Sequence, residues 1–141
     1  MDLKKFIRSI PDYPKKGILF RDITTLIKDE KAFEETINQI VNRSKKFDFN
    51  KIAAIESRGF VFASAFSCIL KKPFNLLRKK NKLPADTHSV DFELEYGTAT
   101  IEVHKDSIKK NDKVLIIDDL IATGGTAEAA AKLVKISDGN V

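Results

Sequence analysis

The stretch KVLIIDDLIATGGTA, Lys113–Ala127, contains in succession a strand, a polar loop and the start of a helix. Its apolar run, Val114–Ile117, does not alternate polar and apolar residues, which is typical of a parallel strand covered on both faces. The segment Thr126–Ile136 is rich in helix-forming residues and is followed by the helix-ending pair Asp138-Gly139. The unusual feature is Asp118-Asp119, because this buried strand ends in two adjacent negative charges.

The loop Thr123–Thr126 predicts an anion site. It lies between a strand end and a helix start, where backbone N–H groups are free and the helix dipole is positive. Glycines let the backbone approach a phosphate, and threonine hydroxyls can donate to it. The sequence has neither the Gly-Lys-Ser/Thr of a Walker A loop nor the Gly-x-Gly-x-x-Gly of dinucleotide-binding folds. We therefore expect a phosphate site of another kind.

Asp118 and Asp119 need partners, because two carboxylates beside a phosphate would otherwise repel it. Vicinal ribose hydroxyls can donate hydrogen bonds to them, and a phosphate-bound Mg²⁺ can lie nearby. The simpler alternative is that Asp119 or Thr123 only caps the helix. The whole run of acids, glycines and threonines favours a site for a sugar phosphate.

Two more apolar runs predict neighbouring strands of an α/β fold. Ile52–Ile55 is followed by a helix to about Leu70 and then by the run Phe74–Leu77, which makes a strand–helix–strand unit. In an open, mainly parallel sheet, ligands bind beyond the carboxyl ends of the strands. The strongest polar clusters lie at those ends, so we expect them to meet in one site: Glu56–Gly59, Arg78–Lys80 and Asp118–Thr126.

The remaining elements are predicted from periodicity. Leu3–Ile10 suits a short helix, and Phe33–Lys45 is an amphipathic one. Val90–His104 alternates polar and apolar residues with a break at Gly97, which predicts a two-stranded hairpin. Asn140-Val141 would begin a further strand, so the sequence predicts a domain whose sheet is incomplete at the C-terminus.

Composition narrows the class of protein. The 141 residues carry a net charge of +5 and one cysteine, and no apolar run approaches the ~18 residues of a membrane span. The N-terminus shows no secretory signal pattern, and a single cysteine favours a reducing cytoplasm. We expect Cys68 to be a buried core thiol without a role. The basic excess favours anionic partners, either nucleic acid or phosphorylated small molecules.

The run LIIDDLIATGGTA resembles the phosphoribosyl-diphosphate motif of the type I phosphoribosyltransferases. Further segments resemble, in the same order, those of the adenine-specific members of this family, and together they cover essentially the whole chain: PDYPKKGILFRDIT (Pro11–Thr24), IESRGF (Ile55–Phe60), LRKKNKLP (Leu77–Pro84) and LEYG (Leu94–Gly97). The resemblance implies one domain over residues 1–141, an open, mainly parallel twisted sheet flanked by helices. It also implies an N-terminal hood within residues 1–30 and a flexible hairpin lid over residues 78–104.

The implied reaction transfers ribose 5-phosphate from phosphoribosyl diphosphate to N9 of adenine, giving AMP and pyrophosphate with Mg²⁺. The resemblance assigns the ribose hydroxyls to Asp118 and Asp119, close to the metal, and the 5′-phosphate to Ala122, Thr123, Gly124, Gly125 and Thr126. It assigns pyrophosphate to Ser57, Arg58, Arg78, Lys79, Lys82 and Tyr96, with a cis peptide near Ser57. Arg58 and Glu95 would be catalytic, with Glu95 handling the adenine proton.

The resemblance places adenine between Phe20 and Leu120, with the main chain of Leu19 and Arg21 reading the purine edge. Asn81 stands where relatives often carry glycine, a change that asparagine tolerates because it accepts left-handed conformations. Relatives continue beyond Val141 through at least one strand and a tail. The family is commonly homodimeric, and neither nucleic acid nor membrane is an expected partner.

Two other functions fit parts of the sequence. A phosphoribosyltransferase for another purine would share the phosphate motif, and GILFRD argues for adenine instead. A non-catalytic regulator that senses phosphoribosyl diphosphate would use its basic residues on DNA. No helix-turn-helix pattern precedes Pro11, and such a regulator would not need Glu95.

Overall fold

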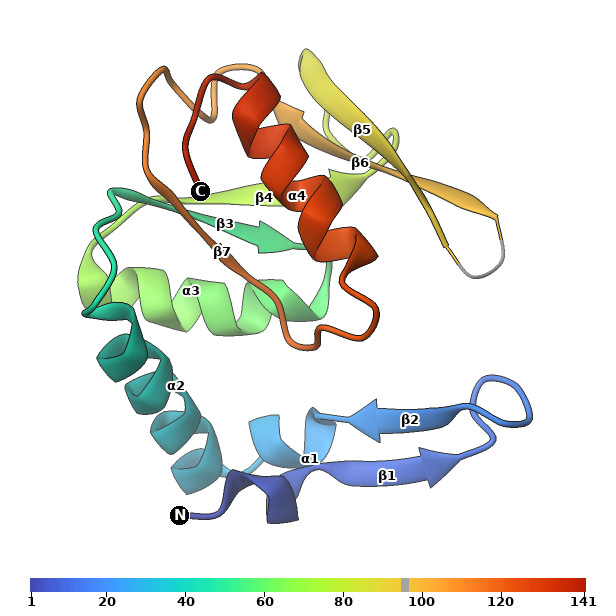
Figure 1. The fold of residues 1–141 in the computed structure, drawn as a ribbon. Coiled ribbons are helices and arrows are strands. Elements are labelled where there is room, and N and C mark those ends of the chain that lie inside the picture. Colours follow the sequence, from blue (N-terminus) through green and yellow to red (C-terminus); the bar gives the residue numbers. More distant parts are fainter. Residues whose placement is uncertain (95–96) are drawn as a thin grey trace. The chain divides into compact units, whose positions relative to one another are not determined.

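A computed structural model describes residues 1–94 and 97–141. They form two compact units, Met1–Lys45 and Lys46–Val141, and each is described by itself (Figure 1). The prediction of one domain over residues 1–141, with a hood and a lid, stays a prediction. No helix among the described residues is both long enough and apolar enough to cross a membrane.

The first unit contains a two-stranded hairpin and helices. In chain order its elements are a 3-10 helix (Leu3–Phe6), β1 (Arg8–Pro11), β2 (Leu19–Asp22), α1 (Thr24–Ile27) and α2 (Glu30–Ser44). The amphipathic helix predicted at Phe33–Lys45 is confirmed as α2. It begins earlier than expected because the Asp29 carboxylate accepts a hydrogen bond from the Ala32 N–H at 2.9 Å and caps the helix.

The helix predicted over Leu3–Ile10 is wrong in its second half. Only the 3-10 turn forms, and from Arg8 the chain pairs antiparallel with β2, Arg8 opposite Asp22. The buried carboxylate of Asp22 accepts hydrogen bonds from the Thr24 N–H and from Arg8. Bonds from Thr24 and Arg8 lower the pKa of Asp22 to about 2. This cross-strand partner outweighs the local helical pattern.

The second unit is built on an open five-stranded sheet in the order β5-β6-β4-β3-β7. The strands are β3 (Lys51–Ile55), β4 (Phe74–Lys79), β5 (Thr87–Glu93), β6 (Thr98–His104) and β7 (Val114–Ile117). β3 pairs in parallel with β4 and β7. β5 and β6 form an antiparallel hairpin, and β6 pairs antiparallel with β4. The predicted strands and the predicted hairpin are therefore confirmed.

Helices α3 (Arg58–Leu70) and α4 (Gly125–Ile136) cover opposite faces of this sheet (Figure 1). Side chains alternate along β3, and Ala53 and Ile55 pack in the core cluster that also contains α4. Both alanines of β3, Ala53 and Ala54, are fully buried. The apolar run Ile52–Ile55 thus becomes a strand that is covered on both sides, whereas Leu76 of β4 is 37% exposed.

Cys68 corrects one expectation, because it is exposed on α3 rather than buried. The buried side of this helix follows the spacing of Gly59, Phe62, Ala63 and Phe66. A residue two positions after Phe66 is rotated away from that side by helical geometry. Periodicity within the helix, rather than the apolar composition of its segment, decides the position of the thiol.

The predicted start of a further strand is seen at the C-terminus. Asn140 forms a parallel bridge with Lys113, and the Val114 N–H donates to the Asn140 carbonyl at 2.7 Å. Gly139 allows the chain to return close to α4, because a Cβ there would lie 3.0 Å from Val134 Cγ1 of that helix and 2.7 Å from Ile108 Cγ2. The last residues therefore lie beside β7.

Leu133→Ala in α4 is expected to lower the free energy of unfolding by about 2–5 kcal/mol, because it removes a fully buried core side chain. Ile136→Ala in the same helix is the matched control. Ile136 is 49% exposed, so its loss should change this free energy by less than about 0.5 kcal/mol. Urea unfolding followed by circular dichroism measures both, and equal midpoints would contradict the packing described for α4.

Candidate active site

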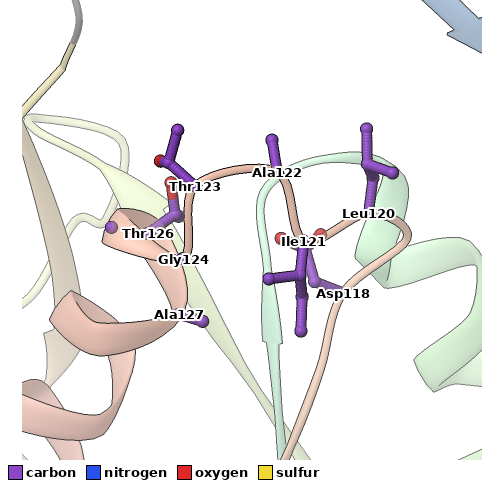
Figure 2. Close-up of a pocket in the computed structure, with 9 residues that line it drawn as sticks. Asp118, Leu120, Ile121, Ala122, Thr123, Gly124, Thr126 and Ala127 are labelled. Atoms are coloured by element: carbon purple, nitrogen blue, oxygen red, sulfur yellow. The ribbon is translucent and has the colours of Figure 1, made fainter.

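The loop after β7 encloses a cavity of about 90 Å³. Its lining residues come from one continuous segment and are Asp118, Leu120, Ile121, Ala122, Thr123, Gly124, Gly125, Thr126 and Ala127. Figure 2 shows Thr123 and Thr126 on the α4 side of the loop, with Asp118 and Leu120 on the opposite side. The predicted phosphate loop therefore forms a concave surface at the carboxyl end of β7.

The helix that follows this loop presents its N-terminus to the same cavity. α4 begins directly after Gly124, whose φ of +90° lies in the left-handed region that favours glycine. The first N–H groups of a helix have no partner within the helix, and the helix dipole is positive there. This part of the site can bind an anion of the size of a phosphate group.

The acid pair at the end of β7 lies against the start of α3. Asp119 Oδ2 is 3.0 Å from Arg58 Nε, an ion pair in which the carboxylate side chain is only 7% exposed. The same oxygen is buried and has no hydrogen-bond partner among the described residues. The Asp119 N–H donates to Asp118 Oδ1 at 2.9 Å. The two acids therefore differ, since Asp119 is paired with a cation and Asp118 is bound to the backbone.

Burial raises the pKa of Asp118 to about 6, and the neighbouring Asp119 carboxylate adds to this rise. The Asp119 backbone N–H and Arg58 act in the opposite direction. The ionised form of Asp118 is thus under-stabilised in the free protein, because its partners do not replace the water it has lost. Hydroxyl groups that donate to this carboxylate would supply the missing hydrogen bonds.

Gly59 sets how closely α3 approaches the acid pair. A Cβ at this position would lie 3.1 Å from Asp118 Oδ1 and 3.1 Å from the Ile117 carbonyl oxygen. Its neighbouring peptide Glu56–Ser57 is cis, as the family resemblance implies. The turn from β3 into α3 is therefore in contact with the end of β7.

Glu56 holds the start of the basic segment at the end of β4. It accepts two bonds from the Arg78 guanidinium at 3.3 Å each and one from the Lys79 N–H at 2.8 Å. Burial alone would raise the pKa of Glu56, but the Lys79 N–H and Arg78 bring it below its ordinary value. Arg78 also donates to the Lys82 carbonyl at 3.1 Å. Its guanidinium is thus bound within the protein, whereas Lys79 and Lys82 are exposed.

A second cavity, of about 610 Å³, joins the ends of β3 and β4 to the hairpin and to α4. Its lining residues are Ile55, Glu56, Lys79, Lys80, Lys82, Phe92, Leu94, Ala99, Thr100, Ile101 and Thr126. Thr126 lines both cavities, so the phosphate loop and the lysines of the basic segment border adjacent cavities. The expectation that the three polar clusters meet is confirmed for these residues.

Two groups of predicted site residues lie either in the first unit or outside the described residues. Leu19, Phe20 and Arg21 lie on β2 in the first unit, where Phe20 packs edge-to-face on Tyr13 with ring centroids 5.2 Å apart. Glu95 and Tyr96 lie outside the described residues. Their assigned roles stay predictions.

The hairpin adds an apolar wall to the larger cavity that was not predicted from the sequence. Phe92 and Leu94 line it together with Ala99 from β6. Alternation in Val90–His104 predicted the strands, and it could also have shown that every second residue faces inward. The missing information was which other segment lies opposite this face.

Comparison with known proteins identifies the family. The phosphoribosyl transferase domain family matches residues 23–140. Adenine phosphoribosyltransferase of Pelagibacter ubique is 79% identical over 141 residues, 100% of this chain and 81% of that protein. The chain belongs to the adenine phosphoribosyltransferase family. The predicted family and the predicted activity, transfer of a phosphoribosyl group to adenine, are thereby confirmed.

Solved structures of adenine phosphoribosyltransferases agree with this fold. The crystal structure of the enzyme from Thermoanaerobacter pseudethanolicus has a TM-score of 0.96 at 48% identity and covers 99% of this chain and 81% of its own. That of the Saccharomyces cerevisiae enzyme, complexed with an imino-altritol bisphosphate and adenine, has a TM-score of 0.92 at 33% identity, with 99% and 82% covered. The predicted α/β fold with an open sheet flanked by helices is confirmed, and its strands are of mixed direction.

Asp118→Asn is expected to stabilise the protein more at neutral pH than at pH 4. The pKa of Asp118 in the folded protein, about 6, lies above the ordinary value of 3.8, so the folded state binds this proton more tightly than the unfolded chain. The contribution of Asp118 to the free energy of unfolding of the wild type is therefore fully present below pH 4 and is lost as the pH rises through 6. Asparagine does not ionise, so the variant avoids this loss.

Urea unfolding of wild type and Asp118→Asn at several pH values between 4 and 8 measures the difference. The free energy of unfolding of the variant, relative to that of the wild type, should rise up to a pH slightly above 6 and then stay constant. Asp106→Asn changes an exposed aspartate in a turn and serves as the matched control. A difference between wild type and Asp118→Asn that is independent of pH would refute the prediction.

Proposed function

We propose that this chain performs its transfer with the donor held across these two adjacent cavities. The observation that carries the proposal is that Thr126 lines both the loop cavity and the cavity that contains Lys79, Lys80 and Lys82. A molecule with a phosphate at one end and a diphosphate at the other requires two anion sites in one continuous region. Phosphoribosyl diphosphate has this form.

The small cavity is assigned to the ribose 5-phosphate part of the donor. The N-terminus of α4 and the hydroxyls of Thr123 and Thr126 would bind the 5′-phosphate, together with the loop residues Ala122, Gly124 and Gly125. The ribose hydroxyls would donate to Asp118 and Asp119. This assignment is supported by the raised pKa of Asp118, because added donors stabilise its charged form.

Pyrophosphate is assigned to the basic residues at the ends of β3 and β4. Lys79 and Lys82 would meet it directly, with Ser57, Arg58 and Tyr96 contributing. Arg78 is bound to Glu56 and to the Lys82 carbonyl, which supports a role in holding the segment in addition to its charge. Fixed positive charge at the leaving group lowers the barrier most where water is excluded.

The reaction is assigned the following bond changes. The bond between C1′ and the pyrophosphate oxygen breaks, a bond forms between adenine N9 and C1′, and the N9 proton passes to the Glu95 carboxylate. The sugar carries positive charge in an oxocarbenium-like transition state, so stabilising the departing pyrophosphate contributes more than activating the nucleophile. Asp118 and Asp119 lie on the sugar side, where negative charge is favourable.

Mg²⁺ fits this site as an ion bound with the substrate. The described residues contain no group of three or more metal-ligating side chains, whereas the donor supplies many oxygen atoms. Asp118 and Asp119 would lie near the ion, and Asp119 Oδ2 is a buried oxygen that is ion-paired with Arg58 at 3.0 Å but accepts no hydrogen bond among the described residues. When bound, Mg²⁺ neutralises part of the diphosphate charge.

Adenine is assigned to Leu19, Phe20, Arg21 and Leu120 on the basis of the family resemblance. Leu19 is 51% exposed and Leu120 is 46% exposed. Apolar side chains that are exposed in the free protein suit a flat aromatic base. A homodimer and a cytoplasmic location are also part of the proposal, and sedimentation of the purified protein measures the first.

The test mixes the protein with Mg²⁺, phosphoribosyl diphosphate and each purine base in turn, with nucleotide products separated by chromatography. AMP should form from adenine, with little product from hypoxanthine or guanine. Donor binding without any nucleotide product would favour the non-catalytic alternative. Product from another purine at a comparable rate would overturn the adenine preference.

Glu95→Gln should lower kcat by about 100-fold or more, the contribution typical of a positioned general base. Its KM for phosphoribosyl diphosphate should stay close to the wild-type value, because Glu95 is not assigned to the donor. Glu93→Gln is the matched control, since Glu93 is an exposed carboxylate at the end of β5. Wild-type turnover by Glu95→Gln in steady-state kinetics would remove Glu95 from its role.

A further inference from the structure

The segment after β4 is a tight turn that carries three lysines. The Lys82 N–H donates to the Lys79 carbonyl at 3.2 Å, and Asn81 has a positive φ of 64°. Lys79, Lys80 and Lys82 all line the larger cavity. Neighbouring ammonium groups repel one another, so a turn of this composition needs other groups to hold its shape.

Glu56 supplies one such group directly after β3, the strand on one side of β4. Its bond from the Lys79 N–H, at 2.8 Å, fixes the first residue of the turn. Arg78, bound to the same carboxylate, donates to the Lys82 carbonyl and so fixes the last residue. The middle of the turn, at Asn81, has a different hydrogen-bond partner.

Glu102 supplies that partner from β6, the strand on the other side of β4. Its Oε2 accepts a hydrogen bond from the Asn81 N–H at 3.1 Å. Glu102 stands opposite Arg78 in the antiparallel pairing, and it is 8% exposed. A buried carboxylate is costly unless it is hydrogen-bonded. The hydrogen bond from the Asn81 N–H therefore offsets part of the cost of burying the Glu102 carboxylate.

The neighbours of Glu102 show that β6 does not need this side chain for its own packing. Ile101 and Val103 are 4% and 0% exposed and belong to the core cluster. Because side chains alternate along a strand, Glu102 points to the opposite face. The apolar neighbours anchor β6, and Glu102 contacts the backbone of the turn.

We propose that Glu102 is a positioning residue for the transfer reaction. Together with Glu56 it holds the turn from both flanking strands, so that Lys79 and Lys82 are presented to the departing pyrophosphate. This role rests on the proposed assignment of pyrophosphate to these lysines. Glu102 itself touches the Asn81 N–H and acts through the shape of the turn.

The test compares Glu102→Leu, which removes the acceptor at similar volume, with Glu102→Gln, which keeps an oxygen acceptor. Glu102→Leu should raise KM for phosphoribosyl diphosphate by about tenfold, the effect of losing one hydrogen bond to a charged group. KM for adenine should stay within about twofold, and Glu102→Gln should recover most of the loss. Hydrogen exchange at the Asn81 amide should become faster in Glu102→Leu only.

Val103→Ala is the matched control, because it weakens the same strand from its other face without touching the turn. If Val103→Ala raises KM for the donor as much as Glu102→Leu at an equal loss of thermal stability, the role of Glu102 is only structural and the proposal is overturned. If Glu102→Leu does not fold, hydrogen exchange and KM of Glu102→Gln decide. An Asn81 amide unprotected in the wild type would then refute the proposal.

Lys79→Ala and Lys82→Ala separate this proposal from the proposed function. A raised donor KM in both lysine variants, with an unchanged KM in Glu102→Leu, overturns the positioning role and leaves the pyrophosphate assignment intact. An unchanged donor KM in the lysine variants overturns the assignment of pyrophosphate to the turn, and the role of Glu102 with it.

Discussion

Strand β3 pairs in parallel with β4 on one side and with β7 on the other, and the candidate site of the second unit depends on this pairing. Parallel strands end at the same edge, so the polar residues after each strand meet there although they are distant in sequence. The two buried alanines of β3 let the helices pack closely on both faces. The sheet thereby fixes the positions of the acid pair, the cis Glu56–Ser57 peptide and the basic turn.

Oppositely charged side chains are paired along this edge of the sheet. Asp119 faces Arg58, and Glu56 faces Arg78, at ion-pair distances of 3.0 and 3.3 Å. Asp118 has a raised pKa, and the lysines of the turn are exposed. The ion pairs hold the backbone. Asp118 and the lysines of the turn, whose charges have no such partner among the described residues, are the groups assigned to the substrate.

The sequence predicts well those elements whose cause is local. Val114–Ile117 is a strand with the predicted bounds, and the phosphate loop leads into α4 as expected. Features decided by distant partners were not predictable from the local pattern. β1 exists because it pairs with β2. The bond from Asn81 to Glu102 likewise depends on a cross-strand register that one sequence does not reveal. The exposure of Cys68 has a local cause instead, the helical periodicity of α3, which the apolar composition of the segment did not show.

Gly59 also limits which changes the protein can tolerate. It belongs to the turn that starts α3, yet its missing side chain leaves room for Asp118 Oδ1 and the Ile117 carbonyl on another strand. A larger residue at this position would push against the acid pair, so its first effect would fall on the carboxylates that we assign to the ribose and not on the helix. In a mutational scan, position 59 should therefore behave as part of the substrate site, although it presents no functional group of its own.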